Sequence, residues 1–250
     1  MSRERVAVVT EATTALGRAI SLAFGRAGYA VMGSGRSNRA GEAVMRSIRD
    51  RGGRAAFHPT DPDSEEAAAA FFAVVAARYG RLDVAVNNGG AALDEGRLLD
   101  VRTDAVERMF RLNVLSVFWG MKYQMRQMLA QDPAGGVILN LASSAGLEGV
   151  PFSAGYAATR HAVVGLTRSA ALEYAGDGIR VLGFVPASVR PAPPAGVSLA
   201  WARDNPQITG FGPVNRHDWL DGTAAAVVRL AAPEASFITE TVVRIDGGPA

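Results

Sequence analysis

Tyr156 and Arg160 are the residues of this chain that most directly suggest chemistry. They stand four apart in the segment SAGYAATR, so a helix here would place the phenol and the guanidinium on the same face. A fixed positive charge about 4 Å from a phenol, at an effective dielectric constant of about 20, favours the phenolate by roughly 4 kcal/mol. The spacing therefore predicts that Tyr156 gives and accepts protons near neutral pH.

A serine and two asparagines extend this pair into a longer pattern. The pattern reads N-x-x-S from Asn140 to Ser143, then twelve residues, then Y-x-x-x-R. It resembles the active-site signature of the short-chain dehydrogenase/reductase family, which usually has lysine at the position of Arg160. The resemblance implies that Ser143 hydrogen-bonds a substrate oxygen, Tyr156 transfers a proton, and Arg160 assists the phenol and holds a ribose. It also implies that Asn113, in RMFRLNVLS, holds a water molecule beside the cation.

The elements that must position these residues form a regular series. Short β-branched strands alternate with helical segments along the whole chain, which predicts a parallel sheet with helices on both faces. We expect seven strands, near residues 5–10, 29–34, 54–58, 82–87, 136–142, 179–185 and 241–245. The fold class is α/β, and the resemblance implies a Rossmann-like doubly wound seven-stranded parallel sheet. Residues 1–250 are predicted to form a single domain, because no linker or repeat interrupts the series.

Two segments carry further structural predictions. Between the third and fourth strands, Asp63 is predicted to cap a helix, Glu66 to complete a capping box, and Gly80 to end the helix. After the sixth strand, a Pro-rich segment at about 187–214 contains two aromatic residues. It is placed to form a lid over the substrate.

The loop TEATTALG, from Thr10 to Gly17, follows the first strand and opens a helix. Such a loop presents backbone amides to a diphosphate. It resembles the T-G-x-x-x-G-x-G loop of the family, which implies cofactor contacts from Thr10, Leu16 and Gly17. Glu11 and Ala15 stand where the family has glycines. A carboxylate about 6 Å from a diphosphate, at an effective dielectric constant of about 40, is expected to weaken binding about tenfold.

Two positions bear on the choice of dinucleotide. Arg36, in GSGRS after the second strand, is suited to a 2′-phosphate, whereas an acidic residue there would bind the ribose hydroxyls of NAD. Asp61 matches the adenine-contacting aspartate of the family. The predicted cofactor is therefore NADP(H) in preference to NAD(H), or none if Glu11 and Ala15 have abolished dinucleotide binding.

Two further segments match the family pattern. VNNGG resembles its N-N-A-G motif, which implies that Asn88, Gly89 and Gly90 lie against the cofactor. VPASVRP stands where the family has P-G and then a threonine, and implies cofactor contacts from Pro186 and Val189. With ITETVVRIDGG near the end of the chain, the resemblance covers essentially all 250 residues.

Composition restricts the partners and the compartment. The net charge of +2 is spread along the chain, so no nucleic-acid partner is expected. No run of about 18 apolar residues occurs, so no membrane partner is expected, and the absence of cysteine fits a cytoplasmic protein. His58, His161 and His217 lack metal-ligand spacing, so no metal site is predicted. Lys122 is the only lysine, so arginine in place of lysine is general in this chain.

Two long helices, expected at 114–130 and 154–175, are more apolar than an isolated domain requires. In the family that this chain resembles, such helices pair between subunits. The expected partners are therefore a small-molecule substrate and further copies of the chain, in a homotetramer or a dimer.

Three functions remain open. The first is an NAD(P)-dependent oxidoreductase that transfers a hydride between NADP(H) and a carbonyl or alcohol substrate. The second is a cofactor-independent lyase similar to the halohydrin dehalogenases, which share this fold and use Ser, Tyr and Arg at this spacing. The third is a catalytically weak or inactive binding protein, suggested by the glycines lost at Glu11, Ala15, Ala187 and Glu240. Saturable binding of NADPH would separate the first function from the second.

Overall fold

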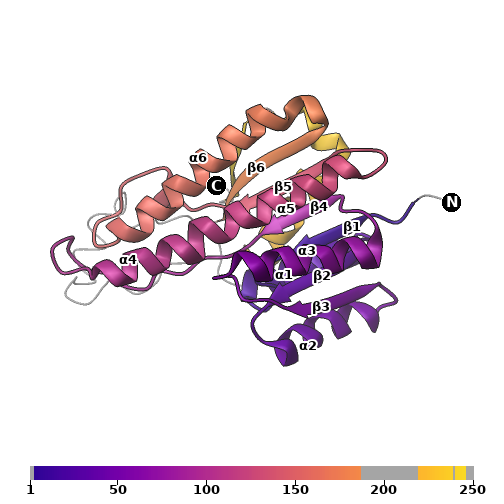
Figure 1. Cartoon of the computed structure of the whole chain (residues 1–250), viewed down its shortest axis with the longest axis horizontal. Helices are drawn as coiled ribbons and strands as arrows, with labels where there is room; N and C mark the ends of the chain where they lie inside the picture. Colours follow the sequence, from indigo (N-terminus) through magenta and orange to yellow (C-terminus); the bar gives the residue numbers. More distant parts are fainter. Residues whose placement is uncertain (1–2, 187–218, 239, 246–250) are drawn as a thin grey trace.

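A computed structural model describes residues 3–186, 219–238 and 240–245 (Figure 1). Seven strands form one sheet in the order β3-β2-β1-β4-β5-β6-β7, and every neighbouring pair is parallel. The strands are β1 (Val6–Val9), β2 (Ala30–Gly35), β3 (Ala55–Pro59), β4 (Val84–Asn87), β5 (Gly136–Leu141), β6 (Ile179–Pro186) and β7 (Val242–Ile245). The predicted sheet is confirmed, with every strand end within two residues of its expected place.

The central strands β1 and β4 are buried along their whole length. Parallel strands that helices cover on both faces have continuous apolar sequences in place of alternating ones. The run VAVV therefore forms β1 in the middle of the sheet, with β2 on one side and β4 on the other.

Helices cover both faces of this sheet. On one face, α1 (Ala15–Arg26) packs between α2 (Asn38–Arg49) and α9 (Trp219–Ala231). On the other face lie α3 (Glu65–Tyr79), α5 (Ser116–Ala130) and α6 (Ala154–Tyr174). The shorter α4 (Thr103–Phe110) precedes α5. Each helical layer shares a buried apolar core with the sheet, so the doubly wound arrangement is confirmed.

The cap of α3 differs from the predicted one. Ser64 caps the helix, because its Oγ accepts a hydrogen bond from the amide of Ala67 at 3.1 Å. Asp63 does not serve as the cap because its carboxylate pairs with Arg111 at 2.6 Å. Gly80 ends α3 in the left-handed conformation, with φ 67°, as predicted.

A salt bridge links α5 to the first turn of α3. Lys122 Nζ lies 2.7 Å from Glu65 Oε1. The hydrogen bond from Lys122 holds the pKa of the Glu65 carboxyl below its ordinary value. Because the two side chains are 38% and 37% exposed, the pair orients the helices more than it stabilises the fold.

Two predictions fall outside the described residues: the lid at about 187–214 and the cofactor contact from Val189. Both therefore stay predictions. Among the helices of the described ranges, none combines the length and the hydropathy that crossing a bilayer requires.

Candidate active site

The carboxyl ends of β1, β4 and β5 carry most of the predicted site residues. Thr10 follows β1, Asn88 follows β4, and Ser143 lies two residues beyond β5. The order of the strands reverses between β1 and β4, which is where open α/β sheets bind their ligands. The fold therefore gathers segments that are far apart in sequence at one edge of the sheet.

Helix α6 presents Tyr156 and Arg160 on one face, as their spacing predicts. The guanidinium carbon lies 5.0 Å from the centre of the Tyr156 ring, over the ring. Arg160 is 2% exposed, whereas Tyr156 is partly exposed. The cation is thus enclosed by protein beside a phenol that remains partly accessible.

Arg160 binds the ends of two neighbouring strands. Its Nη1 donates to the carbonyl oxygens of Gly89 at 3.2 Å and Leu141 at 3.1 Å, and its Nη2 donates to Gly89 at 3.2 Å. Its Nε has no hydrogen-bond partner among the described residues. A buried cation whose hydrogen bonds go to neutral carbonyls favours an anion beside it, either the phenolate or a bound ligand.

Gly90 makes room for this guanidinium. A Cβ at Gly90 would lie 1.6 Å from Arg160 Nη2, and the backbone φ of Gly90 is 150°. Gly89 differs, because a Cβ there would lie 3.8 Å from its nearest heavy atom, Glu11 Cγ. In the VNNGG segment, the second glycine therefore accommodates Arg160, and the first leaves room for a group the size of a Cβ in ordinary contact.

A π-helical turn, Arg111–Leu115, positions Asn113 between α4 and α5. Asn113 is fully buried, and its Oδ1 accepts a hydrogen bond from the Ala91 amide at 2.8 Å. Its Nδ2 donates to the Ala91 carbonyl at 2.9 Å and to Thr159 Oγ1 at 3.0 Å. Both amide hydrogens are thus used, and the side chain joins the loop after β4 to α6. Sequence reasoning missed Thr159, which stands in no motif.

Ser143 begins the loop that packs against α6. It precedes a single 3₁₀ turn (Ser144–Gly146), and its Oγ accepts a hydrogen bond from the Ala145 amide at 3.2 Å. Gly146 contacts α6 closely, since a Cβ there would lie 2.7 Å from the carbonyl oxygen of Arg160. The loop that carries Ser143 is therefore held against the helical turn that carries Arg160.

The loop after β1 is bound to the end of β4. The Asn88 amide donates to Thr10 Oγ1 at 3.0 Å, and Asn88 Nδ2 donates to Thr14 Oγ1 at 3.0 Å. Thr14 also caps α1, accepting from the Gly17 amide at 3.1 Å. A Cβ at Gly17 would lie 2.2 Å from the Glu11 carbonyl oxygen, so only glycine fits there. Thr14 was not among the predicted site residues, although a threonine just before a helix is a recognisable cap.

Glu11 holds an unusual backbone conformation for a residue with a side chain. Its φ of 46° lies in the left-handed region that favours glycine. Burial raises the pKa of its carboxyl above the ordinary value, the positive charge of Arg36 opposes this rise, and the negative charge of Asp61 adds to it. The carboxyl group is thus partly desolvated where the family has a bare glycine.

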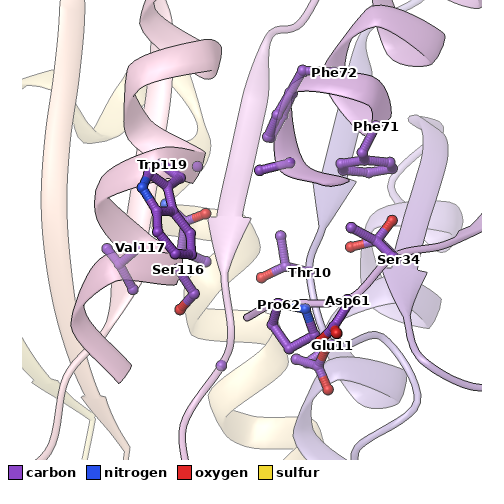
Figure 2. Close-up of a pocket in the computed structure, with 15 residues that line it drawn as sticks. Thr10, Glu11, Ser34, Asp61, Pro62, Phe71, Phe72, Ser116, Val117 and Trp119 are labelled. Carbon is purple, nitrogen blue, oxygen red and sulfur yellow. The ribbon is translucent and has the colours of Figure 1, made fainter. Parts of the chain in front are cut away.

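A cleft lies between the loop after β1 and helix α5 (Figure 2). Its interior cavity has a volume of about 40 Å³, and the rest of the cleft is open to solvent. Glu11 and Asp61 lie together at one end of the cleft, and Phe71 and Phe72 lie at the other. Arg36 pairs with Asp61 at 3.5 Å, and both side chains are more than half exposed. The arginine expected to bind a 2′-phosphate therefore has a carboxylate partner already.

Three observations fit a dinucleotide at this edge of the sheet. Helix α1, of 12 residues, begins there and offers its N-terminal amides. Gly89 has no side chain and leaves room for a group the size of a Cβ, and the buried Asn88 Oδ1 has no partner among the described residues. The carboxylate of Glu11 opposes the fit, because it places negative charge beside the expected phosphates.

Leu16 and Pro186 are less directly placed than the other predicted cofactor residues. The Leu16 side chain is 8% exposed and belongs to the apolar core under α1, so contact with a cofactor would have to come from its backbone. Pro186 is the last residue of β6 and is partly buried. The structure thus places both near the sheet edge without assigning either a ligand contact.

Comparison with known proteins identifies one family and several relatives. The family model described as short chain dehydrogenase matches residues 5–196. The chain is 30% identical to a 3β-hydroxysteroid dehydrogenase from Mediterraneibacter gnavus, over 98% of this chain and 94% of that protein. It is 35% identical to a 2,5-dichloro-2,5-cyclohexadiene-1,4-diol dehydrogenase from Sphingobium indicum, over 96% of this chain and 95% of that protein.

Solved structures with this fold hold either dinucleotide. An actinorhodin polyketide ketoreductase with NADPH matches with a TM-score of 0.81 and 26% identity, over 98% of this chain and 97% of that one. An NAD⁺-bound xylitol dehydrogenase matches with a TM-score of 0.84 and 27% identity, over 99% of this chain and 100% of that one.

Proposed function

Because the chain belongs to the short-chain dehydrogenase family, we propose that it is an oxidoreductase that transfers a hydride between a nicotinamide dinucleotide and a hydroxyl or carbonyl substrate. When bound, the dinucleotide supplies or accepts the hydride. The residues of this chain bind the substrate, move the proton and stabilise the charge.

The observation that carries this proposal is the position of Arg160. Its guanidinium contacts the Tyr156 ring, the carbonyl of Gly89 at the end of β4, and the carbonyl of Leu141 at the end of β5. Ser143 lies two residues beyond Leu141. One buried cation thus ties together the predicted proton donor, the segment that leads to Ser143 and the predicted cofactor segment.

In the proposed reaction, Ser143 hydrogen-bonds the substrate oxygen, and Tyr156 gives that oxygen a proton during reduction or removes it during oxidation. Arg160 stabilises the phenolate that forms on Tyr156. We assign Asn113 a positioning role in place of the water-holding role that the resemblance implies. Both of its amide hydrogens are committed to Ala91 and Thr159, so it holds the loop after β4 against α6.

NADP(H) is the cofactor that this proposal favours. Arg36 is the support, since its side chain is 55% exposed and paired with Asp61 only at 3.5 Å. Exposed ion pairs of this kind contribute about 0–1 kcal/mol, so a 2′-phosphate can replace Asp61 as the partner of Arg36 at little cost. The two solved structures bound NADPH and NAD⁺ respectively, so the preference rests on Arg36.

We further propose that the substrate is a secondary alcohol on a carbocyclic ring, or the matching ketone. The two relatives reported above are named for a hydroxysteroid and for a cyclohexadiene diol. The predicted lid at about 187–214, with Trp201 and Phe211, would offer aromatic surface to such a ring.

Self-association is the remaining part of the proposal. A groove between α5 and α6 is lined by apolar side chains that include Phe118, Met125 and Leu166, and Phe118 is 46% exposed. An apolar groove of this kind between two neighbouring helices of one layer is suited to pairing with a second copy. We propose a homotetramer built on this face, or a dimer if only this one contact forms.

Oxidation of cyclohexanol with NADP⁺ and with NAD⁺, followed by the absorbance of the reduced cofactor, tests the activity. Tyr156→Phe should lower turnover at least about 100-fold, because it removes the proton donor, and should leave the dissociation constant for the cofactor nearly unchanged. Tyr123→Phe is the matched control, since that hydroxyl binds Glu65 at 3.2 Å and lies on α5.

Retained turnover in Tyr156→Phe would remove Tyr156 from the reaction. If neither dinucleotide bound at millimolar concentration, the oxidoreductase proposal would fail. Proton release from a small halohydrin would then support the dehalogenase-like reading, in which the buried Arg160 serves an anionic leaving group. If the protein neither bound a dinucleotide nor released protons from a halohydrin, the remaining reading would be a binding protein without catalytic activity.

A further inference from the structure

Glu11 places a carboxyl group directly in the cleft proposed for the dinucleotide. Its carbonyl accepts hydrogen bonds from the Thr14 amide at 3.1 Å and from Asn88 Nδ2 at 3.3 Å, which fixes the backbone that aims the side chain. The side chain extends toward β4, since its Cγ lies 3.8 Å from the position of a Cβ on Gly89. Figure 2 shows it beside Asp61.

The charged groups around Glu11 do not provide enough positive charge to neutralise a bound diphosphate as well. Arg36, from the loop after β2, is the cation that acts on Glu11, and it also pairs with Asp61 at 3.5 Å. Among the described residues that line the cleft, those from α3, β4 and α5 are uncharged. With Glu11 ionised, two carboxylates therefore share one guanidinium before any phosphate arrives.

The charged and titratable groups next to Arg36 and Asp61 already have other partners. Asp63 Oδ1 accepts a hydrogen bond from Arg111 Nε at 2.6 Å, and the Asp63 amide donates to Asp61 Oδ1 at 3.1 Å. His58 on β3 contacts Thr60 Oγ1 at 3.2 Å. Neither group supplies Glu11 with a compensating positive charge, whereas protonation of Glu11 would remove the repulsion.

We propose that Glu11 makes dinucleotide binding proton-linked: its carboxylate takes up one proton from solvent as the diphosphate half of the cofactor enters the cleft. This inference rests on the proposed function, because it concerns the same cofactor site. The neutral carboxyl no longer repels the phosphates, and its O–H becomes a donor for a phosphate oxygen. Affinity for the dinucleotide is therefore greatest in mildly acidic solution and falls as the pH rises.

The burial of Glu11 acts in the same direction. Desolvation raises the pKa of its carboxyl in the free protein, and a neighbouring diphosphate raises it further in the complex. Because the pKa is higher in the complex than in the free protein, the protonated form binds more tightly. The gain is complete below the pKa of the free protein and is lost as the pH rises through the pKa of the complex.

The test measures binding rather than turnover. Dissociation constants for NADPH and NADH are obtained from tryptophan fluorescence between mildly acidic and mildly alkaline pH, for the wild type and for Glu11→Gln; Trp119 lines the cleft and supplies the signal. The wild type should lose about tenfold more affinity across this range than Glu11→Gln. The 2′-phosphate of NADPH titrates near pH 6, at about the usual value for a phosphate monoester, but it does so with both proteins and is absent from NADH.

Calorimetry in two buffers of different ionisation enthalpy counts the protons directly. With NADH, it should find an uptake that peaks at about half a proton per site for the wild type, which is the maximum that a tenfold change in affinity allows, and none for Glu11→Gln. Asp61→Asn is the control, because it removes the neighbouring carboxylate and should retain the proton uptake.

Three outcomes are distinguishable. Parallel pH profiles for the wild type and Glu11→Gln, with tight binding by both, would overturn the proton linkage and leave the oxidoreductase proposal intact. Loss of the linkage in Asp61→Asn alone would assign it to Asp61 and so overturn the role of Glu11. Absence of binding by every variant at every pH would overturn both proposals together.

Discussion

Arg160 differs from a lysine in what its side chain can reach. A planar guanidinium carries five N–H donors, so it can bind two carbonyl groups at once and keep its face against an aromatic ring. Arg160 does this with Gly89, Leu141 and Tyr156. A lysine in the same place would bring a single ammonium on a flexible chain. The arginine therefore gives a cation with a fixed position, at the cost of the proton relay that lysine permits.

At Gly90, the absence of a side chain is what allows this arrangement. We expect Gly90→Ala to lower the free energy of unfolding by about 2–4 kcal/mol, because the new Cβ would lie 1.6 Å from Arg160 Nη2 and the backbone φ is 150°. Gly89→Ala should change it by less than about 1 kcal/mol, since its Cβ would meet nothing closer than 3.8 Å. Denaturant titration measures both, and equal losses would show that the backbone shifts to accept either alanine.

Glu11 marks the limit of sequence reasoning at the scale of one residue. The sequence alone shows that a carboxylate in a diphosphate-binding loop would repel the phosphates. Its left-handed backbone, with φ 46°, accompanies the hydrogen bond from Asn88 to its carbonyl, and its neighbour Asp61 comes from the segment after β3. Those contacts involve residues from distant segments, so no local pattern reports them.

Among the elements, the rod formed by α4, the π-helical turn and α5 has the most specific task. The turn inserts one extra residue into the helical course, which directs Asn113 inward to Ala91 and Thr159. The rod thereby connects the loop after β4 to α6. Turns of this kind often occur at functional sites, and this one lies beside the predicted active site.

Asn113→Ala tests that connection. The substitution leaves the amide and carbonyl of Ala91 and the hydroxyl of Thr159 without their side-chain partner, and each buried unpaired group costs about 1–3 kcal/mol. We expect the free energy of unfolding to fall by about 3 kcal/mol. Gln127→Ala, which removes one long hydrogen bond of 3.3 Å from the same rod, should cost less than about 1 kcal/mol. Similar values for the two variants, measured by denaturant titration, would contradict the role given to Asn113.

The strands could be predicted from sequence and several helix details could not, for a physical reason. A strand such as VAVV can be recognised because a parallel strand that is buried on both faces has an unbroken apolar sequence. The cap of α3 was predicted at Asp63 and lies at Ser64, because Arg111, from a distant segment, takes the Asp63 carboxylate. The π-helical turn has no sequence signature of its own. Local sequence patterns predict which residues are buried. They do not predict which of several possible partners a polar side chain binds, because those partners come from distant segments.

In the whole molecule, the sheet divides the work between its two halves. The strands on one side of the reversal, β1 to β3, carry Thr10, Arg36 and Asp61 at their carboxyl ends. Those on the other side, β4 to β6, lead to Asn88 and Ser143. The proposed cofactor residues thus come from both halves, and the residues that handle the substrate come from the second.

Assembly belongs to the same scale. If copies pair through the groove between α5 and α6, a charge in that groove should separate them. We expect the wild type to sediment at about four times the chain mass of 26.2 kDa, and Phe118→Arg to sediment at a smaller multiple. Val74→Arg, on α3 and 36% exposed, should leave the wild-type value unchanged. A monomeric wild type at micromolar concentration would contradict the assembly.

The lysine of the salt bridge between Lys122 and Glu65 can be labelled selectively. Lys122 is its one lysine, and it also lines the groove between α5 and α6. An amine-reactive dye can therefore mark a single internal position, without the mixture of products that a typical surface gives. Acylation would remove the positive charge that Glu65 receives at 2.7 Å, so the label should attach slowly, and more slowly still where another subunit shields that edge. The labelling rate of this one amine would then report on subunit exchange without any engineered cysteine.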